Sequence, residues 1–189
     1  MKNMRQWLLI AGCVLVTSSL FAQEKDWAQF GRYAEANKTV KVPSKVVFMG
    51  NSITDGWWPN DSTFFINNQY VDRGISGQTT SEMLVRFRAD VINLKPKAVG
   101  ILAGTNDIAQ NNGYISLENA FGNIVSMVEL AKANNIKPIL CSVMPAYEFG
   151  WRKGLEPAGK IIKLNAMIKA YADKNKIIYV DYHSALADE

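Results

Sequence analysis

The chain alternates short, uninterrupted apolar segments with amphipathic segments, and this alternation restricts the possible folds more than any other feature of the sequence. Apolar runs of this length are typical of strands that are buried on both faces, as in a parallel sheet. The runs span residues 46–49, 98–103, 138–144 and 177–180, with a weaker candidate at 70–71.

Between these runs, hydrophobic residues recur with the period of an α-helix. Three such stripes span residues 83–91, 117–131 and 161–171, and Ser116 is placed to cap the second helix. The pattern predicts one α/β domain, a three-layer sandwich in which helices cover both faces of a five-stranded, mostly parallel sheet. In such sheets ligands bind beyond the carboxyl ends of the strands.

The first 22 residues have the organisation of a secretory signal peptide. Lys2 and Arg5 precede an apolar run over residues 7–16, and small residues close the segment. The run is too short to span a membrane. A lipid anchor at Cys13 is the alternative, but too little apolar sequence precedes that cysteine. We therefore expect cleavage near Ala22, a mature domain over residues 23–189 and export to the periplasm or the extracellular space.

Composition excludes several other classes of protein. Hydrophobic residues make up 48% of the chain and its net charge is +4, which argues against a disordered chain and a nucleic-acid-binding surface. The lysines between residues 160 and 176 follow one amphipathic helix and are interpreted as a solvated face. His183 is the single histidine, and Cys141 lies in an apolar run. We expect no metal site, because zinc needs three or four such ligands, and no cofactor.

Polar and small residues follow three of the predicted strands. Ser52 stands in Gly50-Asn51-Ser52-Ile53, Gly74 stands in the segment 73–78 that follows the weaker strand candidate, and Asn106 stands in Gly104-Thr105-Asn106-Asp107. A serine beside free backbone N–H groups can act as a nucleophile, and an asparagine amide can bind an oxyanion. Each residue type also caps helices or forms turns for purely local reasons.

In this order, these three segments resemble the first three sequence blocks of the SGNH hydrolases, also called GDSL esterases. The resemblance covers the chain from about Lys45 onward and implies a flavodoxin-like sheet. It also implies that Ser52 is the nucleophile, and that its own N–H, the Gly74 N–H and the Asn106 side chain form the oxyanion hole. Asn51 replaces the aspartate of the family's name.

The fourth element of the family is an Asp-x-x-His segment whose histidine activates the serine. No such segment is present, and the closest candidates are Asp181 and His183, which are two residues apart. On an extended segment they would point to the same side, so Asp181 could orient His183. The other interpretation, which we favour, is that the catalytic loop and last helix are missing and that the enzyme is impaired.

The resemblance implies an esterase that acts on a small-molecule or glycan ester. Trp58 and Tyr147 are candidates to contact a sugar ring or an acyl chain, although both could simply pack beneath the loops. We favour removal of acetyl or other short acyl groups from a carbohydrate. A lysophospholipase or thioesterase activity, or a non-catalytic binding protein on the same scaffold, are the alternatives.

Overall fold

The computed structural model describes residues 26–41 and 43–187. The predicted signal peptide and Cys13 lie outside these residues. In the part of the chain that is described, no helix combines the length and hydrophobicity that crossing a membrane requires.

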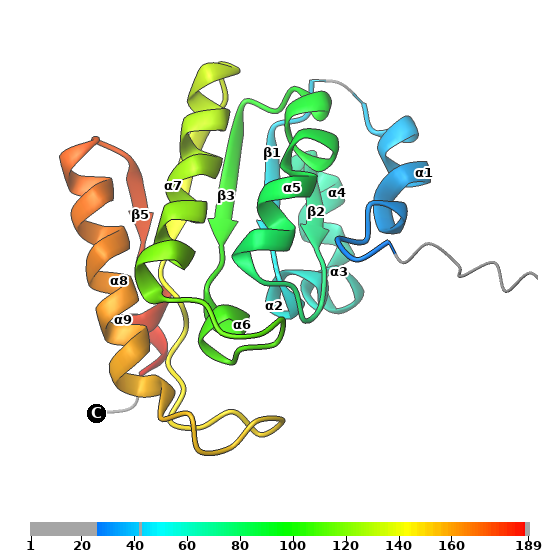
Figure 1. Ribbon diagram of the computed structural model, residues 1–189. Helices are drawn as coiled ribbons and strands as arrows, with labels where there is room; N and C mark the ends of the chain where they lie inside the picture. Colours follow the sequence, from blue (N-terminus) through cyan, green and yellow to red (C-terminus); the bar gives the residue numbers. More distant parts are fainter. Residues whose placement is uncertain (1–25, 42, 188–189) are drawn as a thin grey trace, which may run out of the picture.

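Five parallel strands form one sheet in the order β2-β1-β3-β4-β5, as the apolar runs predict (Figure 1). The short run at 70–71 is the start of a full edge strand. The strands are β1 (Val46–Gly50), β2 (Tyr70–Gly74), β3 (Ala98–Leu102), β4 (Lys137–Cys141) and β5 (Ile178–Val180).

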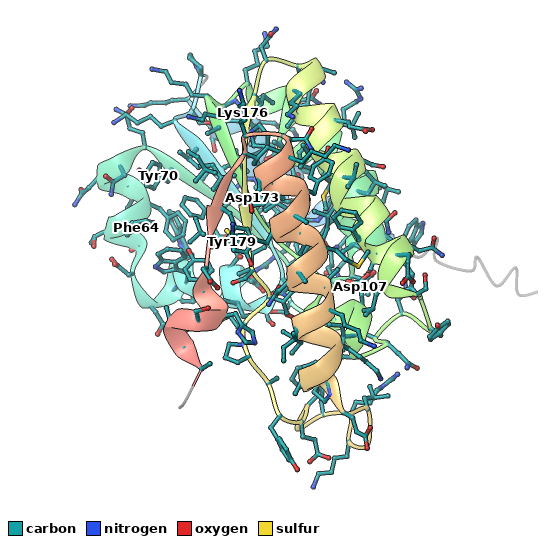
Figure 2. All side chains as sticks on the ribbon, turned by 90° about the vertical axis from the view of Figure 1, so that its left-hand side faces the viewer. Phe64, Tyr70, Asp107, Asp173, Lys176 and Tyr179 are labelled. Carbon is teal, nitrogen blue, oxygen red and sulfur yellow. The ribbon has the colours of Figure 1, made fainter. Side chains whose placement is uncertain are left out.

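Helices cover both faces of this sheet, which confirms the predicted three-layer arrangement. In Figures 1 and 2, α5, α7 and α8 lie on one face, and α4 and α9 lie on the other. The helices are α1 (Gly31–Thr39), α2 (Ser52–Asp55), α3 (Trp57–Asn60), α4 (Ser62–Asn68), α5 (Thr80–Asp90), α6 (Thr105–Ile108), α7 (Leu117–Ala133), α8 (Pro157–Lys174) and α9 (Tyr182–Leu186), with a 3₁₀ turn at η1 (Ile92–Leu94).

The main hydrophobic core lies between the sheet and the layer of α5, α7 and α8. Alternate strand residues supply it, among them Val47, Met49, Val99, Ile101 and Leu140, all buried. The opposite face carries a smaller aromatic cluster, in which the ring of Phe48 contacts Trp57, Phe64, Phe65 and Tyr70.

Local capping explains where several helices begin. The Ser116 hydroxyl accepts a hydrogen bond from the Asn119 N–H (3.1 Å), as predicted. Asp61 caps α4 in the same way, accepting from the Phe64 N–H (3.1 Å). Sequence analysis did not predict α4, because its seven residues are too few to show a helical period.

The strand order creates a crevice between the carboxyl ends of β1 and β3. The chain leaves β1 through α2–α4 toward β2 on one side, and it leaves β3 through α6 and α7 toward β4 on the other. Such a reversal of direction is the point at which open α/β sheets bind ligands. Asn51–Ser52 and Gly104–Asn106 follow these two strands directly.

Arg86 of α5 is fully buried beneath this crevice and connects its parts. Its guanidinium donates to the carbonyl oxygens of Arg73 (2.9 Å) and Gly50 (3.3 Å) at the ends of β2 and β1, and to Gln78 Oε1 (2.5 Å). Asp90 balances its charge at 2.9 Å. Burial lowers the pKa of Arg86 and the ion pair with Asp90 opposes that shift.

We predict that Arg86→Met lowers the free energy of unfolding by about 3–5 kcal/mol, because it leaves the buried Asp90 carboxylate without its ion-pair partner. Urea unfolding followed by circular dichroism measures the change. The matched control is Arg88→Met, an exposed position on the same helix, with an expected effect below about 0.5 kcal/mol. Equal stability of the two variants would contradict the role given to Arg86.

Candidate active site

Ser52 is the first residue of α2 and its side chain is exposed. Asn51 precedes it as the N-cap, and its Oδ1 accepts the Ile53 N–H at 3.0 Å. An amide oxygen makes this bond as a carboxylate would, so asparagine in place of aspartate preserves the turn. The Ser52 N–H has no hydrogen-bond acceptor among the described residues. The serine therefore combines an accessible hydroxyl with an available backbone donor.

Gly74 departs from the prediction that it contributes to an oxyanion hole. Its N–H already donates to Asp72 Oδ1 at 2.6 Å, and the residue is buried. A Cβ atom at this position would lie 2.1 Å from the Asp55 nitrogen and 2.6 Å from the Thr54 carbonyl carbon. Glycine is required here because β2 packs directly against the backbone of α2.

Gly77, three residues later, has the properties expected of the oxyanion-hole N–H donor that the sequence assigned to Gly74. It is exposed, it has a φ of +82°, and its N–H has no acceptor in the part of the chain that the structure describes. Its carbonyl accepts from Asn111 Nδ2 at 3.3 Å. Sequence reasoning did not select Gly77, because Gly74 and Gly77 lie in the same short segment. Only their tertiary contacts distinguish the two glycines.

Asn106 lies at the start of α6, is buried, and donates through Nδ2 to the Gln78 carbonyl at 2.9 Å. This bond uses one of the two hydrogens on Asn106 Nδ2, and the second is available to another acceptor. The neighbouring Asp107 accepts from the Thr80 N–H (3.0 Å) and hydroxyl (2.6 Å). Burial raises the pKa of Asp107, and the hydrogen bonds from Thr80 oppose the shift. The structure thus joins the segments after β2 and β3, which are far apart in sequence.

Asp181 and His183 are not arranged as a catalytic pair. Asp181 caps α9, and its carboxylate accepts from the Ser184 N–H (3.1 Å) and hydroxyl (2.7 Å). These bonds, with a smaller effect of nearby His183, lower the pKa of Asp181. His183 lies within the first turn of α9, so the extended geometry that would align the two side chains is absent. Its backbone N–H donates to Ser142 Oγ at 2.8 Å.

The position of β5 also separates His183 from Ser52. β5 is three strands away from β1 in the sheet. At about 4.8 Å between neighbouring strands, this is a separation of roughly 14 Å. Among the described residues, the His183 side chain makes no hydrogen bond to Ser52, and the bond that His183 makes outside α9 runs from its backbone N–H to Ser142.

The aromatic residues that the sequence singled out lie in different places. Trp58 is 44% exposed and packs on Phe65 beside β2, whereas Tyr147 is 93% exposed. Trp151 stacks on Phe149 and donates to Asn111 Oδ1 at 3.0 Å, and Asn111 in turn contacts Gly77. Trp151 is therefore the aromatic residue most directly connected to the candidate oxyanion loop.

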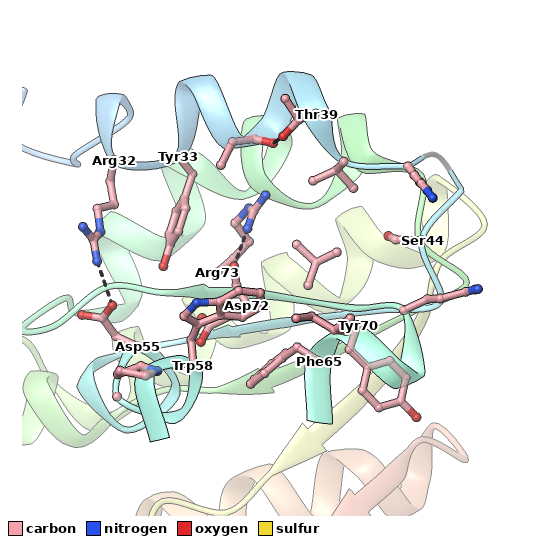
Figure 3. A pocket seen from close by; sticks show the side chains of 18 of the residues that line it. Arg32, Tyr33, Thr39, Ser44, Asp55, Trp58, Phe65, Tyr70, Asp72 and Arg73 are labelled. Carbon is pink, nitrogen blue, oxygen red and sulfur yellow. Dashed lines mark hydrogen bonds and ion pairs between the residues drawn. The ribbon is translucent and has the colours of Figure 1, made fainter. Parts of the chain in front are cut away.

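Two cavities flank the crevice. The α1–β2 cavity has a volume of about 1090 Å³ and lies between α1, α4 and β2 (Figure 3). The α3–α9 cavity has a volume of about 490 Å³, and apolar residues such as Ile53, Leu102 and Leu186 line it. Ser52 and Asn106 line neither cavity. The candidate nucleophile is exposed and lies outside these two cavities.

Among the described residues, no three histidine, cysteine or acidic side chains are grouped to hold a metal ion. Cys141 is buried and unpaired, and burial raises the pKa of its thiol to about 12. This thiol is therefore neutral at physiological pH and is unsuited to metal binding or nucleophilic attack.

Residues 48–189 match the GDSL-like lipase/acylhydrolase family. The chain belongs to this family. It is 53% identical to a candidate acylhydrolase of Bacteroides fragilis NCTC 9343 (88% of this chain, 82% of that chain, TM-score 0.86). It is 51% identical to a GDSL-like lipase of Bacteroides thetaiotaomicron VPI-5482 (86% and 82%, TM-score 0.84). The resemblance to the SGNH hydrolases is confirmed.

More distant relatives of this GDSL-like protein include the uncharacterized lipoprotein YqeF of Bacillus subtilis (strain 168). It is 36% identical over 85 residues, which are 43% of this chain and about a third (35%) of that protein. Axe2, an acetylxylan esterase from Geobacillus stearothermophilus, shares the fold at 20% identity (77% of this chain, 79% of that chain, TM-score 0.61).

We predict that Gly74→Ala in this GDSL-like domain lowers the free energy of unfolding by about 3 kcal/mol, because its Cβ would collide with the backbone of α2. The control is Gly122→Ala in α7, where a Cβ would meet no atom of another element within 4 Å. There alanine is expected to stabilise the helix by up to about 1 kcal/mol. Chemical denaturation compares the two, and a neutral Gly74→Ala would show that β2 can move away from α2.

Proposed function

We propose that this protein is a serine esterase that removes acetyl or other short acyl groups from a carbohydrate. The observation that carries the proposal is the exposed Ser52 hydroxyl at the β1–β3 crevice, with the donors of Asn106 and Gly77 on the adjoining segments. Membership of an acylhydrolase family supports the reaction class.

In the proposed reaction, Ser52 Oγ attacks the ester carbonyl carbon, and its proton passes to a base. The bond to the alcohol oxygen then breaks, which leaves an acyl group on Ser52 and releases the alcohol with a proton. The oxyanion is bound by the N–H groups of Ser52 and Gly77 and by the second amide hydrogen of Asn106. Water then attacks the acyl group and regenerates the serine.

The open position of Ser52 supports a carbohydrate substrate. A polymer can lie across an exposed surface, whereas a long acyl chain needs an apolar channel at the nucleophile. The Trp151 indole, fixed by Phe149 and Asn111, provides a flat face beside the crevice on which a sugar ring can stack. Tyr147 and Trp58 remain candidate contacts further from Ser52.

A lipolytic activity is the second candidate, and the α3–α9 cavity favours it. This cavity is apolar and is lined by Ile53, the residue next to the nucleophile. An acyl chain that entered it would lie along the face of the sheet beneath α3. Hydrolysis rates of the acetyl and octanoyl esters of one alcohol therefore distinguish the two candidate functions. A faster reaction of the acetyl ester favours the short-acyl esterase, and a faster reaction of the octanoyl ester favours the lipolytic activity.

We also propose that the protein is exported, with residues 1–22 as the signal peptide. The basic residues and apolar run at its beginning support this, as does the match to a protein named a lipoprotein. Cleavage near Ala22 remains our preferred interpretation over attachment of a lipid to Cys13.

We predict that p-nitrophenyl acetate transfers its acetyl group to Ser52. An acyl-enzyme accumulates when deacylation is slow, so peptide mass spectrometry can locate the group. The Ser52→Ala variant is expected to lose the label. The control is Ser62→Ala, which is expected to keep the label, because the Ser62 side chain makes no hydrogen bond in the described structure. Acetylation of other residues at the same rate in the Ser52→Ala variant would favour a non-catalytic binding protein.

We further propose that residues 1–189 alone turn over esters slowly, because no imidazole in the described residues is oriented by a carboxylate beside Ser52. His183→Ala is then expected to change the hydrolysis rate by less than about twofold, whereas loss of a working base costs about 10⁴-fold or more. Free imidazole in the buffer should accelerate wild type but not Ser52→Ala. A hundredfold loss in His183→Ala would identify His183 as the base.

A further inference from the structure

Helix α2 ends at an acidic residue, Asp55, one turn after Ser52. The Asp55 N–H donates to the Asn51 carbonyl at 2.9 Å, and the Gly56 N–H donates to the Ser52 carbonyl at 2.8 Å. Residues three apart in a helix lie on the same face, so the Asp55 and Ser52 side chains leave α2 on one side. The proposed reaction gives Asp55 no role.

The Asp55 carboxylate divides its two oxygens between two partners. Its Oδ2 accepts from the Ser76 N–H at 3.1 Å and from the Ser76 hydroxyl at 2.6 Å. Its Oδ1 accepts from Arg32 of α1 at 3.1 Å, the ion pair drawn in Figure 3. The Arg32 side chain is 54% exposed, and exposed ion pairs contribute little to stability. The bonds to Ser76 are therefore the contact that requires an explanation.

The charge of Asp55 suits it to hold Ser76. Partial burial alone would raise the pKa of Asp55, but the hydrogen bonds from Ser76 and Arg32 outweigh this effect and lower the pKa. The carboxylate is ionised at neutral pH and acts only as an acceptor, which matches the two donors of Ser76. Hydrogen bonds to a charged acceptor are also shorter and stronger than those between neutral groups.

Ser76 and Gly77 form the tip of a β-turn over residues 75–78. The Gln78 N–H donates to the Ile75 carbonyl at 3.3 Å, and the φ of +82° at Gly77 is typical of the third residue of a type II turn. Ile75 and Gln78 are buried, whereas the two tip residues are exposed. The turn thus has a base fixed in the protein interior and an exposed tip.

Asp55 is the main contact that holds this tip. In the part of the chain that the structure describes, the hydrogen bonds of Ser76 run to Asp55, and the bond of Gly77 runs from Asn111 Nδ2 to the Gly77 carbonyl at 3.3 Å. The bond from Asn111 is the longest of the three and comes from a neutral amide. The Gly77 N–H belongs to the peptide that follows Ser76, so its position depends on where Asp55 holds Ser76.

We propose that Asp55 is a positioning residue, which holds the 75–78 turn so that the Gly77 N–H stays directed at the oxyanion that forms at Ser52. One four-residue helix then carries the nucleophile at its first residue and the support of an oxyanion donor at its last. A donor stabilises developing charge best when it is already in place. The inference rests on the proposed esterase function, and Asp55 itself does not contact the substrate.

Three substitutions separate the two contacts of Asp55. Asp55→Ala removes both contacts. Asp55→Asn keeps one oxygen that can accept from Ser76 but loses the ion pair, and Arg32→Gln also loses only the ion pair. A positioning role predicts that Asp55→Ala alone is slow, whereas a merely structural ion pair predicts that the three variants behave alike.

The measurement is the release of p-nitrophenol from p-nitrophenyl acetate, with imidazole in the buffer as the base. We expect Asp55→Ala to lower the rate constant of Ser52 acetylation at least about tenfold and to change KM less than about twofold, because the Gly77 N–H binds the oxyanion and not the ground-state ester. Removal of a whole oxyanion donor costs about 10²–10³-fold, and a displaced donor costs less. Asp55→Asn and Arg32→Gln should stay within about threefold of wild type.

A second variant tests the route through Ser76 and replaces Asp55→Ala if that protein does not fold, which circular dichroism shows. Ser76→Ala removes the 2.6 Å bond at an exposed position and should slow acetylation at least about threefold, again with KM unchanged. The double variant Asp55→Ala/Ser76→Ala should be no slower than Asp55→Ala, because both substitutions break the same contact.

Two results would overturn the positioning role and leave the esterase proposal intact. The first is a smaller loss than these in the acetylation rate constant, or a loss that lies in KM. The second is an equal loss in Asp55→Ala, Asp55→Asn and Arg32→Gln, which would assign the effect to the ion pair. If wild type itself were not acetylated at Ser52, the esterase proposal would fall, and the positioning role with it.

Discussion

The buried guanidinium of Arg86 is the interaction on which the candidate site depends. It connects the carbonyl ends of β1 and β2 with the side chain of Gln78, and Asp90 balances its charge. The Gln78 carbonyl then receives the Asn106 amide. Arg86 thus connects the segments that follow β1 and β2, and Gln78 extends this connection to the segment that follows β3. Because a charge this deeply buried tolerates few other arrangements, the geometry of the crevice follows from it.

The exposed nucleophile and the two cavities divide the surface into regions of different chemistry. Ser52 stands at a crevice with polar donors, the α3–α9 cavity is apolar, and the α1–β2 cavity contains fixed charges of both signs. Asp55 connects the first region to the third, because it ends α2, accepts from Ser76 (2.6 Å) and pairs with Arg32.

Much of this arrangement could be predicted from local sequence. The strands near residues 46, 98, 138 and 177 were found because a strand buried on both faces leaves a continuous apolar run, and the helix α7 because it is long enough to show its period. The strand β2 was seen only in part, since Asp72 and Arg73 break its apolar run. The burial of Arg73 depends on contacts with Tyr33 and Asn37 of α1, a helix that is short, mostly exposed and without a recognisable hydrophobic stripe.

The sequence by itself determined the alternation of strands and helices and the family, and it selected Ser52 and Asn106 as candidate site residues, because each of these signals is encoded within a few adjacent residues. Only the tertiary structure distinguishes Gly74 from Gly77, because Gly74 packs against the backbone of α2 and its N–H is bonded to Asp72. It also decided that Asp181 caps α9 and is not aligned with His183 on an extended segment. These outcomes depend on contacts between segments distant in sequence, which no local pattern encodes.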